Sequence, residues 1–132
     1  MNLGTILPRH ARYRPDHLAV VFEHHRLSYS EMNARVNRLS RGLLKLGIHK
    51  GDKLAMLLPN SLEMLDIYWA CAKTCIVAVP LSPLLRDKGL SGLLADSDAV
   101  GIVTTQAMIK HLEPLRDQPV SRSATPRQLR WH

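Results

Sequence analysis

Two cysteines four residues apart, Cys71 and Cys75, are the first residues whose type and spacing suggest chemistry. On a helix the two thiols would share one face. A metal site would need further ligands, and no histidine or acid stands nearby at a suitable spacing. Because the pair lies in the apolar run IYWACAKTCIVAV, we expect two buried thiols in a protein of a reducing compartment.

Two other small groups of residues could bind a metal ion. His24 and His25 are adjacent in the turn of a predicted hairpin, but successive strand residues point to opposite faces and no partner ligand is visible. Asp96 and Asp98 could hold a cation, although a solvated turn between a helix and a strand is the simpler interpretation. We therefore predict no metal-binding residue.

Motifs for phosphate binding and nucleophilic catalysis are missing from the sequence. It contains neither G-x-x-x-x-G-K followed by Ser or Thr nor G-x-G-x-x-G, the glycine-rich patterns whose backbone amides hold phosphates. It contains no G-x-S-x-G that would present a serine nucleophile. The residues by themselves therefore give no catalytic and no cofactor-binding assignment.

The composition is that of an ordinary globular protein, with 45% hydrophobic and 22% charged residues, and 132 residues suffice for one domain. The net charge of +7 is uneven, because residues 1–60 hold ten Lys or Arg against four acids. A basic surface suits nucleic acid or an anionic membrane. A solvated basic helix face plus a basic tail is the simpler explanation, and aromatic residues, at 5%, are scarce for stacking on bases.

The pattern that organises the chain runs from residue 26 to residue 83. Ser28 and Glu31 form the S-x-x-E pair of a capping box, and apolar residues then recur at steps of three and four, which predicts an amphipathic helix that ends at Gly47. The sequence next predicts a turn at 50–52, a strand at 53–58, a helix capped by Asn60 or Ser61 that runs to Thr74 and is buried on most sides, and a strand at 76–79 that Pro80 stops.

Shorter elements are predicted on either side. They are a helix capped by Asn2 or Thr5 that ends near Pro15, a hairpin of residues 17–23 and 26–28, a helix at 87–96 with Leu90, Leu93 and Leu94 inward, a strand at 99–103, and a helix from Thr104 or Thr105 to Leu112. The predicted fold class is α/β, a partial parallel-sheet subdomain with helices on both faces, preceded by a short β-hairpin. No apolar run is long enough to span a membrane, so we expect a cytoplasmic protein.

From Pro114 the sequence changes character. Residues 114–132 hold three prolines and four arginines and show no clear apolar period. We therefore predict that residues 1–113 form the folded part of the chain and that residues 114–132 are a basic, extended or disordered tail.

An ordered set of features from Leu27 onward resembles the opening of the adenylate-forming, or AMP-binding, superfamily, which includes acyl-CoA synthetases, luciferases and peptide-synthetase adenylation domains. The matching pieces are LSYSE at 27–31, KGD at 50–52, PNS at 59–61, ACAK at 70–73 and VPL at 79–81. The run YWACAK, followed by a strand and PLSPLL, is most similar to fatty-acid and aryl-acid CoA ligases. The resemblance covers about residues 2–112.

The resemblance implies an ATP-dependent ligase that joins a carboxylic acid to AMP and then passes the acyl group to a thiol, usually that of coenzyme A. Such enzymes use ATP, Mg²⁺ and coenzyme A. Their Ser/Thr/Gly-rich phosphate loop, their adenine and ribose motifs and their catalytic lysine would all lie downstream of this sequence. The resemblance therefore transfers no catalytic, cofactor-binding or metal-binding residue, and we expect this fragment to bind none of these cofactors.

Two features depart from the family's pattern. Glycine is usual at the position of Cys75, where a left-handed residue would end the helix, so cysteine should strain that turn by about 1 kcal/mol or more. The tail stands where the family continues through further sheet to the phosphate loop. This departure suggests a truncation, a frameshift or a fragmentary gene model.

These features predict a truncated N-terminal portion of an ATP-dependent acyl-CoA synthetase that is inactive alone, because nothing in it would stabilise the charge of adenylyl transfer. Uncovered sheet edges and apolar faces should make it marginally stable or self-associating. One alternative is a non-catalytic module that partners a full-length ligase. The other is a basic nucleic-acid-binding protein. The partners we expect are a second copy or a larger synthetase subunit, without nucleic acid, and the acyl substrate is not predicted.

Overall fold

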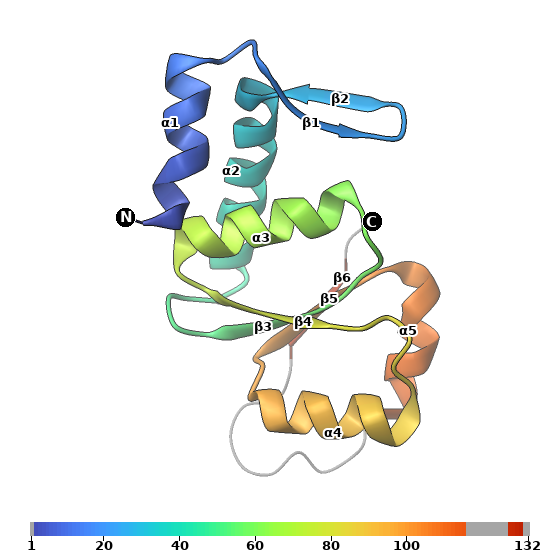
Figure 1. Ribbon diagram of the computed structural model, residues 1–132. Helices are drawn as coiled ribbons and strands as arrows, with labels where there is room; N and C mark the ends of the chain where they lie inside the picture. The colour runs from blue at the N-terminus through green and yellow to red at the C-terminus, as the bar shows by residue number, and fades with distance from the viewer. Residues whose placement is uncertain (1, 116–126, 131–132) are drawn as a thin grey trace. The chain divides into compact units, whose positions relative to one another are not determined.

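The computed structural model describes residues 2–115 and 127–130 (Figure 1). The chain divides into two compact units, of which unit 1 comprises Met1–Gly51 and Asn60–Val77 and unit 2 comprises Asp52–Pro59 and Ala78–His132. In chain order the elements are η1 (Leu3–Thr5), α1 (Ile6–Tyr13), β1 (Leu18–Phe22), β2 (His25–Ser28), α2 (Tyr29–Lys45), β3 (Lys53–Leu57), α3 (Leu62–Thr74), β4 (Val77–Leu81), α4 (Asp87–Ser97), β5 (Gly101–Thr104), α5 (Gln106–Leu112), η2 (Glu113–Leu115) and β6 (Arg127–Arg130).

Unit 1 consists of the predicted hairpin and three helices. β1 and β2 pair antiparallel, with Phe22 opposite His25, so the turn lies one residue earlier than expected. Helix α2 packs against both α1 and α3 (Figure 1). The buried side chains of these three helices are Leu7, Met32, Val36, Ser40, Leu43, Leu62, Asp66, Ile67, Ala70 and Cys71.

Local sequence explains where the two long helices of unit 1 begin. The Ser28 hydroxyl accepts a hydrogen bond from the Glu31 amide at 3.2 Å, and the Glu31 carboxylate accepts one from the Ser28 amide at 2.8 Å. This reciprocal pair confirms the predicted capping box. Ser61 caps α3 in the same way, by accepting from the Met64 amide at 3.2 Å. Gly47 follows α2 with a φ of 86°, the left-handed conformation expected there.

Unit 2 is built on a sheet whose strand order is β4-β3-β5-β6. β3 pairs with β5 in parallel, with Leu54 opposite Gly101, and β5 pairs with β6 in parallel. The flanking cluster of buried leucines consists of Leu57, Leu90 and Leu112, and Leu81, Leu85, Leu94, Ile102, Met108 and Leu115 pack against it. The parallel strands β3, β5 and β6 of this sheet with the flanking helices, together with the antiparallel hairpin, confirm the predicted α/β class.

Two strands differ from the sequence-based expectations. β4 continues through Pro80 to Leu81, although Pro80 was expected to end it. β4 is an edge strand of the sheet, so its outer side has no neighbouring strand to which a backbone N–H must donate. Proline, which lacks this N–H, is tolerated in such a strand. Residues 127–130 form β6, although they belong to the segment expected to be a tail. An extended segment can pair with a sheet edge through backbone hydrogen bonds alone. Such pairing needs no apolar pattern in the sequence, so the sequence did not predict this strand. Residues 116–126 and 131–132 of the expected tail lie outside the described residues.

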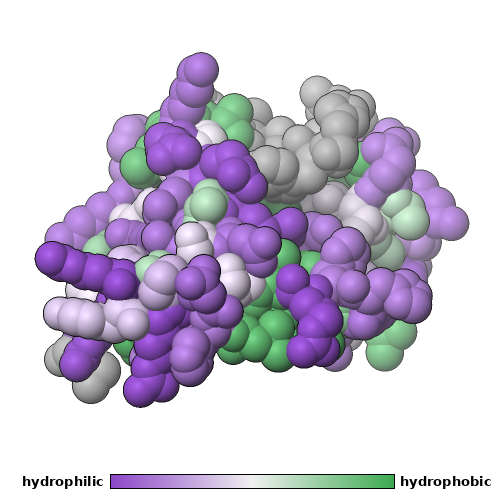
Figure 2. All heavy atoms as spheres, turned by 90° about the horizontal axis from the view of Figure 1, so that it is seen from above, coloured by the Kyte–Doolittle hydropathy of each residue, from purple (hydrophilic) through white to green (hydrophobic). Residues whose placement is uncertain are grey.

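Apolar side chains are less completely covered than the sequence suggested. Most residues of α3 are buried or half-buried, as expected, but Tyr68 on α3 is 39% exposed. Leu93 on α4 is 44% exposed and does not point inward. An apolar side chain predicts burial only where another element covers it. One face of the molecule is mostly hydrophilic, with hydrophobic residues visible between the polar ones (Figure 2). Within residues 2–115 and 127–130, no helix has the length and hydrophobicity needed to cross a membrane.

Candidate functional site

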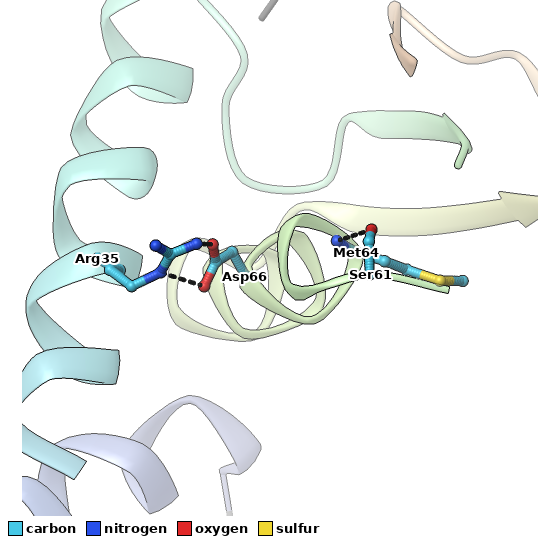
Figure 3. A network of polar contacts seen from close by, with 4 residues as sticks. All are labelled: Arg35, Ser61, Met64 and Asp66. Carbon is cyan, nitrogen blue, oxygen red and sulfur yellow. Dashed lines mark hydrogen bonds and ion pairs between the residues drawn. The ribbon is translucent and has the colours of Figure 1, made fainter. Parts of the chain in front are cut away.

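The most organised group of polar side chains lies between α2 and α3. The Arg35 Nη2 atom is 2.6 Å from the Asp66 Oδ2 atom, and the Arg35 Nε atom is 3.4 Å from the other carboxylate oxygen (Figure 3). The Arg35 guanidinium on α2 therefore donates two hydrogen bonds to the Asp66 carboxylate on α3. Such paired contacts fix orientation as well as distance.

Burial dominates the electrostatics of this ion pair. The Asp66 residue is only 7% exposed, and desolvation raises its pKa, while the hydrogen bond from Arg35 acts in the opposite direction. The hydrogen bond to Asp66 raises the pKa of Arg35. Desolvation and the hydrogen bond from Arg35 thus act on this carboxylate in opposite directions, and a buried ion pair of this kind adds little net stability. The pair therefore specifies how α2 meets α3 more than it stabilises that contact.

Lys73 adds a second polar contact between the same helices. Its ammonium group donates hydrogen bonds to the side-chain oxygen of Asn33 and, at 2.6 Å, to that of Asn37. The two asparagines are four residues apart on α2 and so share one face. Partial burial lowers the pKa of Lys73. The ammonium group is engaged in these hydrogen bonds, so the arrangement suits positioning better than nucleophilic attack.

The two cysteines have different surroundings. Cys71 is buried, and burial raises the pKa of its thiol to about 11, which leaves it a protonated and weak nucleophile at neutral pH. Cys75 is exposed, so the prediction that both thiols are buried was wrong for this one. Its φ is 58°, the left-handed conformation that was expected at this helix end, and the carbonyl of Cys75 accepts a hydrogen bond from the Gly51 amide at 2.8 Å.

The histidines and aspartates that the sequence suggested as possible metal ligands do not form a site with the polar groups between α2 and α3. Asp98 is exposed and its carboxylate is 3.9 Å from the Lys53 ammonium, a weak surface ion pair. His25 begins β2 and is exposed. Among residues 2–115 and 127–130, no three His, Cys, Asp or Glu side chains gather in a way that could hold a metal ion.

Sequence reasoning missed the polar contacts between α2 and α3. One signal was present, because Asp66 is the single charged residue in the run from Met64 to Ala72, and a buried acid requires a partner. A second signal was the i, i+4 spacing of Asn33 and Asn37 beside the apolar stripe of α2. Neither signal identifies the partner residue, because the partners are 31 to 40 residues away in the sequence.

Comparison with known proteins gives the chain a family. Residues 7–129 match the family model described as AMP-binding enzyme. The long-chain-fatty-acid–CoA ligase FadD13 of Mycobacterium tuberculosis is 34% identical over 119 residues, which are 89% of this chain and 24% of the relative. A feruloyl-CoA synthase of Amycolatopsis sp is 38% identical over 104 residues, 79% of this chain and 21% of the relative.

A solved structure agrees with these relatives. The fatty acyl CoA synthetase of Mycobacterium tuberculosis superposes with a TM-score of 0.89 at 30% identity, over 98% of this chain and 26% of that one. The chain thus spans about a quarter or less of the length of the proteins it matches. Since the family model covers nearly all of the sequence and the fold agrees, the chain belongs to the AMP-binding enzyme family and corresponds to the N-terminal segment of that superfamily.

Proposed function

We propose that this chain is the N-terminal portion of an ATP-dependent acyl-CoA synthetase of the cytoplasm, and that it supplies scaffold rather than catalytic groups. The complete reaction would activate a carboxylic acid as an acyl-adenylate and then form a thioester with coenzyme A, with ATP and Mg²⁺ as cofactors. Similarity to a long-chain-fatty-acid–CoA ligase and to a feruloyl-CoA synthase supports this assignment.

The sequence contains no phosphate-binding motif, and this observation supports the proposal that the chain is inactive alone. Adenylyl transfer builds negative charge on the phosphates, and enzymes stabilise it with prearranged donors or metal ions. Among the described residues, the most organised polar groups, Arg35 and Lys73, already donate to partners within unit 1. The sequence holds no glycine-rich loop that could take over this task.

The test is pyrophosphate release by the purified 132-residue chain with ATP, Mg²⁺ and coenzyme A. The acids supplied should include long-chain fatty acids and ferulate, and FadD13 assayed in parallel serves as the positive control. We expect release no faster than without protein, while circular dichroism shows the helices to be folded. Release that requires both the chain and one of the acids would overturn the proposal.

We also propose that the isolated chain associates with itself or with a larger synthetase subunit. Several apolar side chains are open to solvent, among them Tyr13 at 71%, Leu3 at 65% and Leu84 at 85% exposure. Exposed apolar surface of this kind favours association. Sedimentation velocity at micromolar concentrations should show dimers or larger species. A single monomer boundary over the whole concentration range would contradict the proposal.

A further inference from the structure

The solvent-facing side of α2 carries only positive charge beyond its first turn. Arg38, Arg41 and Lys45 are exposed and stand three and four residues apart, so they form one stripe along the helix. The 20 residues from 32 to 51 contain five Lys or Arg and no acid. We call the three side chains Arg38, Arg41 and Lys45 the basic stripe.

Two acids close to α2 already have partners. Glu31, on the first turn of α2, accepts the hydrogen bond from the Ser28 amide that completes the capping box. Asp66 on α3 is close enough for Arg38 to lower its pKa, but the carboxylate is held by Arg35. No ion pair described within residues 2–115 includes a member of the stripe. Among the residues that the structure describes, these three charges face solvent and have no carboxylate partner.

Half-exposed leucines lie next to the stripe, and the neighbouring helix is also basic. Leu44 and Leu46 flank Lys45 and are each 45% exposed. Helix α1, which packs against α2, carries two exposed bases of its own, Arg9 and Arg12. Half-exposed leucines beside unpaired bases are the composition of helices that lie at a lipid interface, where cations meet headgroups and apolar groups reach the acyl boundary.

We propose that the basic stripe docks the chain onto an anionic lipid surface. Three bases on one helix face complement a negatively charged bilayer, and each Lys or Arg near such a surface strengthens binding roughly fivefold. Lipid is favoured over nucleic acid because a nucleic-acid backbone provides no apolar phase for Leu44 and Leu46. This inference rests on unit 1 alone and is independent of the proposed ligase function.

The experiment is co-sedimentation of the full chain with vesicles of phosphatidylcholine, with and without phosphatidylserine, at low and at physiological ionic strength. We expect binding that requires phosphatidylserine and weakens as salt rises. The triple variant Arg38→Gln, Arg41→Gln, Lys45→Gln should bind about 100-fold more weakly, because three roughly fivefold contributions multiply. Glutamine is a good helix former, so α2 should persist, and circular dichroism verifies this.

A matched control removes three charges elsewhere. The variant Arg26→Gln, Lys88→Gln, Lys110→Gln changes exposed bases outside α2 and lowers the net charge equally. We expect it to retain most of the binding. Equal losses in both triple variants would overturn the proposal, because net charge and not the stripe would then govern binding. So would equal binding to vesicles without phosphatidylserine, or stripe-dependent binding to duplex DNA or RNA that is tighter than binding to lipid.

Discussion

The two long helices of unit 1 and the helices of unit 2 are specified in different ways. In unit 1, α2 and α3 begin at Ser28 and Ser61, and both serines accept a hydrogen bond from a first-turn amide. In unit 2, α4 and α5 begin at Arg86 and Thr105, and neither residue makes a side-chain cap. The contact between α2 and α3 includes an ion pair and amide hydrogen bonds, whereas α4 and α5 meet the sheet through leucines and other apolar side chains.

This difference indicates which interactions stabilise each helix. A capped helix of 17 residues such as α2 starts with a local advantage. Helices of 11 and 7 residues without caps are too short to be stable in water and depend on the apolar cluster. We therefore expect damage to the cluster to unfold unit 2 and damage to caps or polar contacts to weaken unit 1. The predictions below test this division, from the largest effect to the smallest.

Truncating the centre of the leucine cluster should have the largest effect. Leu90 is fully buried between α4 and the sheet, and a Leu→Ala change at such a site costs about 3 kcal/mol through lost burial and a cavity. Leu90→Ala should lower the free energy of unfolding by this amount and should abolish hydrogen-exchange protection in α4 before α2. The control Leu93→Ala, at a 44% exposed position, should cost well under half as much. Equal loss of protection in α2 and α4 would contradict the division.

Removing Arg35 should have the next largest effect. Arg35→Ala leaves the buried Asp66 carboxylate without its partner, which costs about 2 kcal/mol, less than for a fully buried pair because the arginine side chain is 32% exposed. Urea unfolding measures the loss, and Arg41→Ala, an exposed position on the same helix, should be nearly neutral. Adding Asp66→Asn to Arg35→Ala should restore part of the stability. Failure to restore any would show that the stranded charge is not the cause.

The helix ends were predictable because their determinants are close together in the sequence. Ser28 and Glu31 are three residues apart, so the capping box could be recognised without any tertiary contact, and Ser61 was identified in the same way. The left-handed conformation of Cys75 was expected from the family resemblance, in which glycine is usual at this position, and not from local sequence. The α/β order followed from alternating apolar runs and helical periods.

Features that depend on distant neighbours were not predictable. Arg35 and Asp66 are 31 residues apart, and nothing local distinguishes Arg35 from Arg38 or Arg41. The exposure of Tyr68 depends on which elements cover α3, and the side-chain type alone does not reveal this. β6 joins β5 through backbone pairing, which leaves no signature in the residues that pair. In each case the missing information was a long-range contact.

Removing a helix-capping residue should lower the free energy of unfolding by about 1 kcal/mol in unit 1 and by less in unit 2. Ser28→Ala breaks the capping box of α2 and should lower the free energy of unfolding by about this amount. The matched change Thr105→Ala, at the start of α5, should cost only a few tenths of a kcal/mol because Thr105 makes no capping hydrogen bond. Urea midpoints of the two variants provide the measurement. A cost for Thr105→Ala as large as that for Ser28→Ala would show that α5 is also specified locally.

The two left-handed helix ends that are not glycine should show the smallest difference in stability. Cys75 ends α3 with a φ of 58°, and Asp98 ends α4 with a φ of 55°. Glycine relieves the steric cost of this conformation but loses more entropy on folding, so Cys75→Gly should stabilise the chain by about 0.5 kcal/mol. Aspartate tolerates the left-handed region better than cysteine, so Asp98→Gly should gain less or nothing. Thermal midpoints of both variants decide the matter: a gain for Asp98→Gly that matches or exceeds that for Cys75→Gly would mean that the cysteine turn stores no special strain.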